Sequence, residues 1–119
     1  MKNKTFSNYI RRQREKLRSR DKAFSLRKVA ERIGVQPSYL SKVERAEESP
    51  PSEMKIVALA HELGEDPDVL LALAGKVSSE VQQIIRKRPE LFAKLVRDLK
   101  NAPDRQVSRL VREIRDGNW

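Results

Sequence analysis

The chain has 119 residues, enough for one small domain or for one domain with an appendage. It contains no cysteine and only one histidine, His61, which excludes disulfides, thiol catalysis, cysteine-ligated zinc and a two-histidine metal site within one chain. The formal net charge of +9 indicates an anionic partner, most often a nucleic acid.

The positive charge is concentrated at the start of the chain. Residues 2–28 hold eleven Lys or Arg and two acids, residues 29–76 hold five bases and nine acids, and residues 77–119 hold ten bases and six acids. A basic segment followed by a mildly acidic one is typical of a protein that binds phosphates at one surface. A solvated basic helix face with no partner would give the same distribution.

Apolar residues recur at helical intervals along the chain, and no stretch alternates with period two for the length of a strand. Five helices are expected first, over about residues 5–19, 25–33, 37–45, 52–63 and 66–74. Ser25, Ser52 and Asp66 are suited to cap three of them, and Pro37 and Pro67 are suited to first turns. Glycines are expected to end three of these helices, at positions 34, 64 and 75.

Three more helices are expected in the remaining residues. The first is broken over residues 86–89, and apolar stripes over residues 91–99 and 107–114 indicate the other two. We therefore divide the chain into a domain over residues 1–76 and a helical extension over residues 77–119. The extension is too short to bury its stripes alone, so it must pack against the first domain or against another chain.

Two short helices joined by a tight turn with a glycine form a helix-turn-helix arrangement, here over residues 25–33 and 37–45. The small Ala30 allows the two helices to cross closely, and Gly34 allows the sharp turn between them. The back of the second helix is apolar, at Val35, Leu40 and Val43. Its front is then free to enter a DNA major groove, which is wide enough for one helix. Small helical domains also use such hairpins for packing alone.

The stretch over residues 24–71 resembles the Cro/C1-type (Xre) helix-turn-helix family of bacterial and phage transcriptional regulators, and the resemblance covers residues 5–75. The residues that carry it are Ser25, Val29, Ala30, Gly34, Val35, Leu40, Ser41, Val43, Glu44, Leu59, Ala60, Leu63 and Gly64. It implies an all-α, five-helix, lambda-repressor-like domain, here followed by the helical extension. It also implies a sequence-specific repressor that binds a two-fold operator in double-stranded DNA as a dimer, with residues 37–45 in the major groove.

The chain departs from the family pattern in three places. Leu26 stands where the family usually has a glutamine near phosphate, which weakens one expected backbone contact. Ala46 stands where the family usually has glycine. Residues 18–22 look like an insertion between the first two helices, and they form either a basic loop that reaches flanking phosphate or a longer first helix.

The resemblance also implies roles for individual residues. Those expected at base edges are Gln36, Pro37, Ser38, Tyr39 and Lys42, and those expected at phosphates are Ser25, Arg27, Lys28, Ser41 and Arg45. A structural ion pair is implied between Arg14 and Glu44. The alternative for each polar side chain is plain solvation, and for Tyr39 it is packing on the first helix.

Two-fold partners are usual for such DNA-binding proteins, because one helix in one groove gives too little affinity. We therefore expect a homodimer with an interface formed by Leu91, Phe92, Leu95, Leu99, Val107, Leu110, Val111 and Ile114. Packing within one chain is the alternative. Regulators that resemble this chain are also paired with a neighbouring toxin or metallopeptidase, so in an antitoxin-like module the C-terminal helices would bind such a protein instead.

Other classes of protein fit the sequence poorly. No enzyme is expected, because the chain has no nucleophile–base pair, no metal constellation and no glycine-rich phosphate loop, and neither a cofactor nor a metal is expected. The longest apolar run, Val69–Ala74, has six residues, whereas a membrane span needs about 20. The first residues lack the apolar stretch of a secretory signal, so a cytoplasmic protein is expected.

Overall fold

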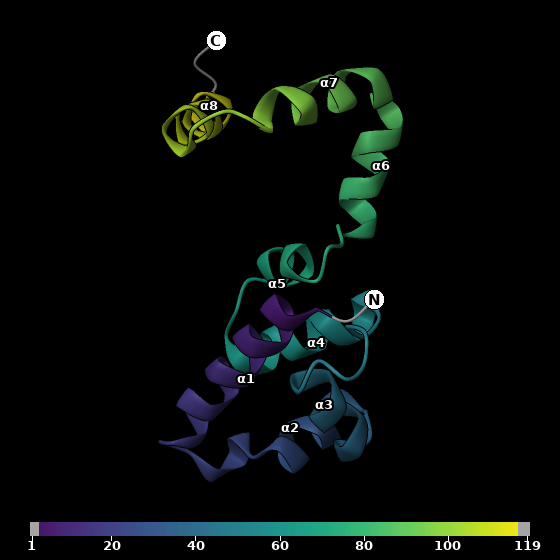
Figure 1. Cartoon of the computed structure of the whole chain (residues 1–119), viewed down its shortest axis with the longest axis vertical. Helices are drawn as coiled ribbons and strands as arrows, with labels where there is room; N and C mark the ends of the chain where they lie inside the picture. Colours follow the sequence, from purple (N-terminus) through teal and green to yellow (C-terminus); the bar gives the residue numbers. More distant parts are fainter. Residues whose placement is uncertain (1–2, 117–119) are drawn as a thin grey trace. The chain divides into compact units, whose positions relative to one another are not determined.

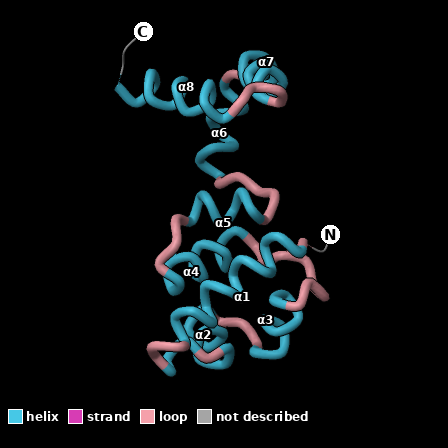
Figure 2. The backbone as a smooth tube through the Cα atoms, turned by 60° about the vertical axis from the view of Figure 1, so that its left-hand side comes forward, coloured by secondary structure: helices cyan, strands magenta, loops and turns pink. Residues whose placement is uncertain are grey.

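The computed structural model describes residues 3–116, and in this part of the chain it contains eight α-helices, one short 3₁₀ helix and no strand (Figures 1 and 2). The elements are α1 (Lys4–Arg18), η1 (Lys22–Phe24), α2 (Leu26–Ile33), α3 (Pro37–Glu44), α4 (Glu53–Leu63), α5 (Pro67–Leu73), α6 (Ser79–Lys87), α7 (Pro89–Leu99) and α8 (Asp104–Asp116). The predicted all-α fold is confirmed. The chain divides into two compact units between Ser78 and Ser79, called here the N-terminal unit and the C-terminal unit.

Side-chain caps begin most helices of the N-terminal unit. Ser25 and Ser52 accept hydrogen bonds from the backbone N–H groups three residues later, and Asp66 accepts one from the N–H two residues later. Asn3, whose capping role was not predicted, does the same for Phe6 at 3.0 Å. Pro37 lies in the first turn of α3, where its missing N–H leaves no hydrogen bond unmade. These local signals explain why the predicted starts of α2 to α5 agree with the structure.

Four consecutive helices end in the same way, with a residue in the left-handed backbone conformation just after the helix. These residues are Gly34, Ala46, Gly64 and Gly75. After α3, the N–H of Glu47 donates to the carbonyl of Lys42 at 2.8 Å and that of Ala46 donates to Val43 at 3.0 Å. This pair of bonds is the Schellman motif, which normally has glycine at the left-handed position. Ala46 adopts the conformation, with φ of 59°, in spite of its Cβ.

The core of the N-terminal unit receives residues from all five of its helices. Those fully or almost fully buried are Phe6, Ile10, Val29, Ala30, Ile33, Leu40, Val43, Ile56, Leu59, Ala60, Leu63, Leu70 and Leu71. The first helix, α1, packs against α3, α4 and α5, while α2 packs against α3 and α4. Two hydrogen bonds also join the beginning of α1 to other helices. Ser7 donates to the carbonyl of Val43 in α3, and Asn3 donates to that of Leu73 in α5.

Two predictions about connections need correction. A longer first helix through residues 18–22 is wrong, because α1 ends at Arg18 and is followed by a turn and η1. A break over residues 86–89 is wrong in its extent, because α6 continues to Lys87 and only Arg88 separates it from α7. The change of direction needs a single residue since Pro89 occupies the first position of α7, where no backbone N–H is required.

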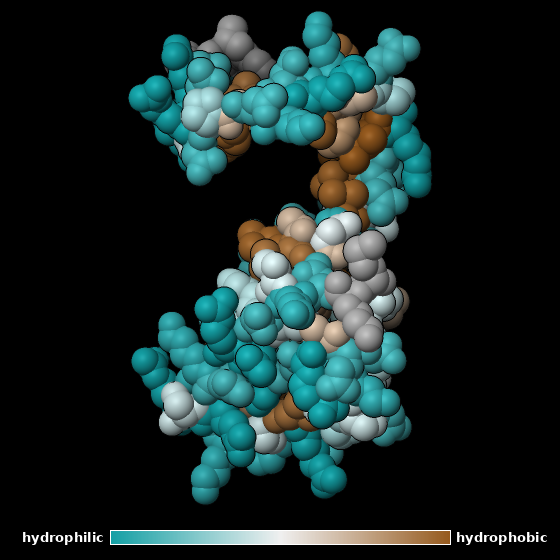
Figure 3. Space-filling view, in the orientation of Figure 1, coloured by the Kyte–Doolittle hydropathy of each residue, from teal (hydrophilic) through white to brown (hydrophobic). Residues whose placement is uncertain are grey.

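The C-terminal unit has no core of its own in the part that the structure describes. No residue of α6, α7 or α8 is buried. Leu91 is 67% exposed, Val111 55% and Ile114 50%, although each belongs to an apolar stripe on its helix. Apolar residues therefore lie open on the surface of these helices, where Figure 3 shows them in brown. An exposed apolar surface on several helices is typical of an interaction site.

Replacing Ala46 with glycine tests whether the left-handed end of α3 is strained. We expect Ala46→Gly to raise the free energy of unfolding of the N-terminal unit by about 1 kcal/mol, because L-residues disfavour this conformation. Ala72→Gly, at an exposed position inside α5, is the matched control and should lower it by up to about 1 kcal/mol. Urea denaturation followed by circular dichroism measures both, and a destabilised Ala46→Gly variant would contradict the expectation.

Candidate nucleic-acid interface

The two helices α2 and α3 form a helix-turn-helix with a three-residue turn. Gly34 has φ of 77°, and the N–H of Val35 donates to the carbonyl of Ala30 at 3.0 Å, which closes the end of α2. Ala30 has no exposed surface, and α2 packs directly on α3. Leu40 and Val43 of α3 are equally buried. The opposite face of α3 is therefore the one that a ligand can reach.

The residues expected at base edges differ in how much of each side chain is exposed to solvent. Gln36, Ser38 and Lys42 are exposed, whereas Pro37 and Tyr39 are half-buried. Ser38 and Lys42 are four residues apart, so they lie on one face of α3. This face combines hydrogen-bond donors and acceptors with one cation. It can recognise base edges in a groove wide enough to admit a helix.

Tyr39 lies partly against the hydrophobic core of the N-terminal unit. Burial of the ring, together with the nearby negative charge of Glu48, raises the pKa of its phenol above the ordinary value. The hydroxyl can donate a hydrogen bond to a ligand. Only part of this side chain is left for contact with a ligand.

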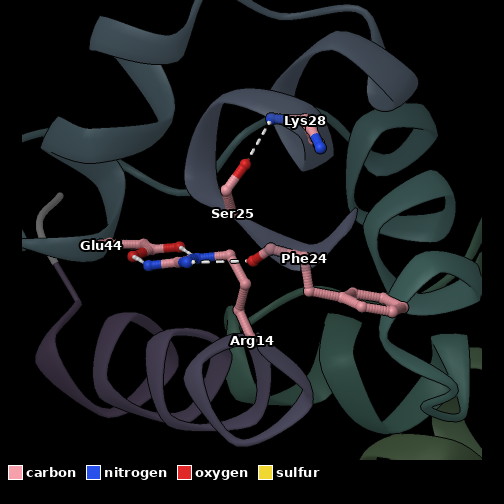
Figure 4. Close-up of polar contacts among 5 residues, drawn as sticks. All are labelled: Arg14, Phe24, Ser25, Lys28 and Glu44. Atoms are coloured by element: carbon pink, nitrogen blue, oxygen red, sulfur yellow. Dashed lines mark hydrogen bonds and ion pairs between the residues drawn. The ribbon is translucent and has the colours of Figure 1, made fainter. Parts of the chain in front are cut away.

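The residues expected at phosphates also differ from one another. Arg27 and Lys28 are exposed in the first turn of α2, and Ser41 is half-buried. The Ser25 hydroxyl accepts from the N–H of Lys28 at 3.3 Å and so caps α2 (Figure 4). Its own hydrogen remains available for a phosphate oxygen. Backbone N–H groups and cations at a helix start suit an anion.

Arg45 has a partner within the chain. Its Nε lies 3.2 Å from a carboxylate oxygen of Glu47, and both side chains are more than half exposed. An exposed pair of this kind is worth at most about 1 kcal/mol, so a phosphate can replace the carboxylate. By contrast, Arg27, Lys28 and Lys42 have no ion-pair partner among residues 3–116.

Arg14 of α1 joins the two helices of the motif from behind (Figure 4). Its Nε and Nη2 donate to the two carboxylate oxygens of Glu44 at 2.7 and 2.9 Å, and its Nη1 donates to the carbonyl of Phe24 at 3.2 Å. The side chains of Arg14 and Glu44 are only 6% and 4% exposed. The hydrogen-bonded carboxylate raises the pKa of Arg14 above its ordinary value, so the guanidinium stays charged. The contact fixes the last residue of α3 and the residue before the cap of α2.

Lys55 of α4 holds the other end of α2, a role that was not predicted from the sequence. Its ammonium donates to the carbonyls of Ile33 at 3.0 Å and Gly34 at 3.3 Å. A cation at this end satisfies free carbonyls and complements the helix dipole. No local signal could have revealed this role, because the carbonyls lie 21 and 22 residues earlier in the chain.

Residues 3–116 contain neither a cluster of metal ligands nor a membrane-spanning helix. No group of three or more His, Cys, Asp or Glu is close enough to hold a metal ion among these residues. None of the described helices combines the length and the apolar character needed to cross a membrane.

The geometry agrees with a comparison against known protein families. A profile of the helix-turn-helix family matches residues 10–70, more than half of the chain, and this segment contains α2, α3 and α4 completely. The comparison with curated proteins returned no match, and neither did the comparison with solved structures.

The buried Arg14–Glu44 pair should be far more sensitive to neutralisation than an exposed one. We expect Glu44→Gln to lower the free energy of unfolding by about 3 kcal/mol, because it leaves the charge of Arg14 buried without a counter-charge. Glu62→Gln makes the same chemical change in the more exposed Arg32–Glu62 pair and should cost less than about 1 kcal/mol. Urea titration measures both, and equal losses would contradict the structural role given to Arg14.

Proposed function

The chain belongs to the Cro/C1-type helix-turn-helix family of DNA-binding transcriptional regulators, and from this we propose that it is a sequence-specific repressor that binds a two-fold operator as a homodimer. The observation that carries the proposal is the exposed polar face of α3, opposite its buried Leu40 and Val43. In the proposed complex α3 lies in the major groove, and occupation of a promoter blocks transcription.

Base recognition is assigned to the exposed face of α3. The Lys42 ammonium donates to guanine O6 and N7, a common specific contact. Ser38 bonds a base edge, and Gln36 lies just before the helix, where an amide can reach a base or the backbone. Pro37 offers no donor, and Tyr39 adds only the part of its ring that the core leaves uncovered. Sequence recognition then depends mainly on Ser38 and Lys42.

Phosphate binding is assigned to the two ends of the motif. Ser25, Arg27 and Lys28 surround the beginning of α2, where backbone N–H groups and two cations with no ion-pair partner among residues 3–116 favour an anion. Ser41 and Arg45 are assigned to phosphates at α3. Arg45 would break its ion pair with Glu47 to bind one. These contacts fix the register of the protein on DNA and carry no sequence information.

Dimerisation is assigned to the C-terminal unit. The proposed interface consists of Leu91, Phe92, Leu95, Leu99, Val107, Leu110, Val111 and Ile114, all of which are exposed or half-buried. An apolar surface without a core beneath it supports association. A second copy of the chain is the favoured occupant. A two-fold operator has two half-sites, and each half-site needs its own copy of α3. A toxin or metallopeptidase in an antitoxin-like complex is the alternative occupant.

Lys42→Ala tests base recognition by α3. On a duplex selected from a random library by the protein itself, we expect the variant to lose about 1–3 kcal/mol of binding free energy, which is a complex about 5- to 150-fold weaker. On random duplex the loss should be small. Lys16→Ala removes one exposed charge from α1 and is the matched control. Fluorescence anisotropy at two salt concentrations measures both, and binding that is equal on both duplexes and indifferent to Lys42 would contradict the proposal.

Charges placed in the apolar stripe of α8 test the dimer. We expect Leu110→Asp/Ile114→Asp to convert a dimer into a monomer, because two carboxylates cannot be buried unpaired in an apolar interface. Ser108→Asp/Arg112→Asp carries the same two carboxylates at exposed positions of α8 and should remain a dimer. Light scattering gives the mass of each. A wild-type monomer, together with copurification of an unrelated protein in stoichiometric amount, would support the antitoxin-like alternative instead.

A further inference from the structure

The turn between α1 and α2 carries a dense positive charge that the helix-turn-helix does not account for. From residue 18 to residue 28 the chain has five bases and one acid, and two of the bases, Arg27 and Lys28, belong to the helix-turn-helix. Three of the bases, Arg18, Arg20 and Lys22, precede α2, and all three are exposed. None of the three has an ion-pair partner among residues 3–116. Three neighbouring cations left unpaired repel one another, which an anionic partner would relieve.

The one acid in the turn, Asp21, is hydrogen-bonded to a backbone N–H group. A carboxylate oxygen of Asp21 accepts a hydrogen bond from the N–H of Ala23 at 2.8 Å and caps η1. It forms no ion pair with the bases beside it among the described residues. The carboxylate of Asp21 is therefore hydrogen-bonded to the backbone, while the side chains of Arg18, Arg20 and Lys22 are exposed to solvent.

Hydrogen bonds hold the turn in place beside α2. The N–H of Asp21 donates to the carbonyl of Leu17 at 3.0 Å, and that of Ser25 donates to Lys22 at 3.2 Å. Phe24 is fixed twice, through its carbonyl by Arg14 and through its ring, which lies 5.3 Å below the guanidinium of Arg32. The three cations thus stand on an ordered backbone, and less conformational entropy is lost when they bind.

We propose that Arg18, Arg20 and Lys22 form a second phosphate-binding patch that extends the DNA contact beyond the helix-turn-helix. The inference rests on the proposed DNA-binding function and adds residues to it. Lys22 stands one 3₁₀ turn before Ser25, about 6 Å along that helix. One DNA strand carries a phosphate about every 3.4 Å of helix axis, so a patch at this spacing is close enough to reach the phosphates next to those at the beginning of α2. In Figure 1 this turn lies at the lower left, where α1 gives way to α2.

The salt dependence of DNA binding separates phosphate contacts from general charge. We compare full-length wild type with Arg18→Ala/Arg20→Ala/Lys22→Ala and with Lys4→Ala/Arg12→Ala/Lys16→Ala, which removes three exposed bases along α1. In a plot of log affinity against log salt concentration, each lost phosphate contact makes the slope shallower by about 0.9. The slope should therefore become shallower by about 2 to 3 in the first variant and by much less in the second. The ratio of affinities for selected and random duplexes should stay unchanged, because phosphates carry no sequence information.

Shortening the DNA gives an independent measure of the same patch. Removing about three base pairs from each end of the selected duplex, beyond the recognised bases, should weaken wild type and leave the first variant unaffected. Equal slopes in wild type and the first variant, or equal losses in both variants, would overturn the patch. If wild type binds selected and random duplexes equally, the proposed repressor is overturned. In that case a change in the salt slope confined to the first variant would still support the patch. Absence of any DNA binding would overturn both.

Discussion

The surface assigned to DNA depends on one buried guanidinium. Arg14 extends from α1 and donates to the carboxylate at the end of α3 and to the carbonyl directly before the cap of α2. Because the guanidinium is planar and its donors have fixed directions, the two helix ends cannot shift independently of each other. Burying this charge is costly, so the pair contributes geometry more than net stability. The distance between the proposed phosphate and base contacts is set by this contact.

A second cation holds the opposite end of α2. Lys55 reaches from α4 to the carbonyls of Ile33 and Gly34, and the nearby Arg32 pairs with Glu62 at 2.6 Å. The helix is thus fastened at its beginning from α1 and at its end from α4, and the direction of α3 follows from the short turn after Gly34. Part of the positive charge of the chain therefore serves the fold. Net charge alone cannot show which bases remain for an anionic ligand.

Local signals in the sequence were sufficient for the helix-turn-helix, and the family resemblance implied the Arg14–Glu44 pair, but neither indicated Lys55. The Ser25 cap and the left-handed Gly34 act over three or four residues, so their effect on α2 could be predicted from the sequence. Lys55 acts on carbonyls more than twenty residues away, and no periodicity reveals such a contact. Arg88 alone separates α6 from α7, because one residue before a proline is enough to redirect a chain. Ala46 keeps the geometry of a glycine, since hydrogen bonds of the surrounding turn determine it.

The distribution of charge along α3 favours one way of approaching DNA. Ser38, near the beginning of the helix, is uncharged and lies where the backbone N–H groups carry partial positive charge. Lys42 follows one turn later, but Arg45 is paired with Glu47, and Glu48 comes next. Two carboxylates just beyond the helix disfavour deep entry of this end into the groove, so in the proposed complex it stays at the level of the phosphates, where Arg45 is proposed to bind one. In the proposed complex the beginning of α3 is then the end that enters most deeply, and it is the end from which recognition helices contact base edges.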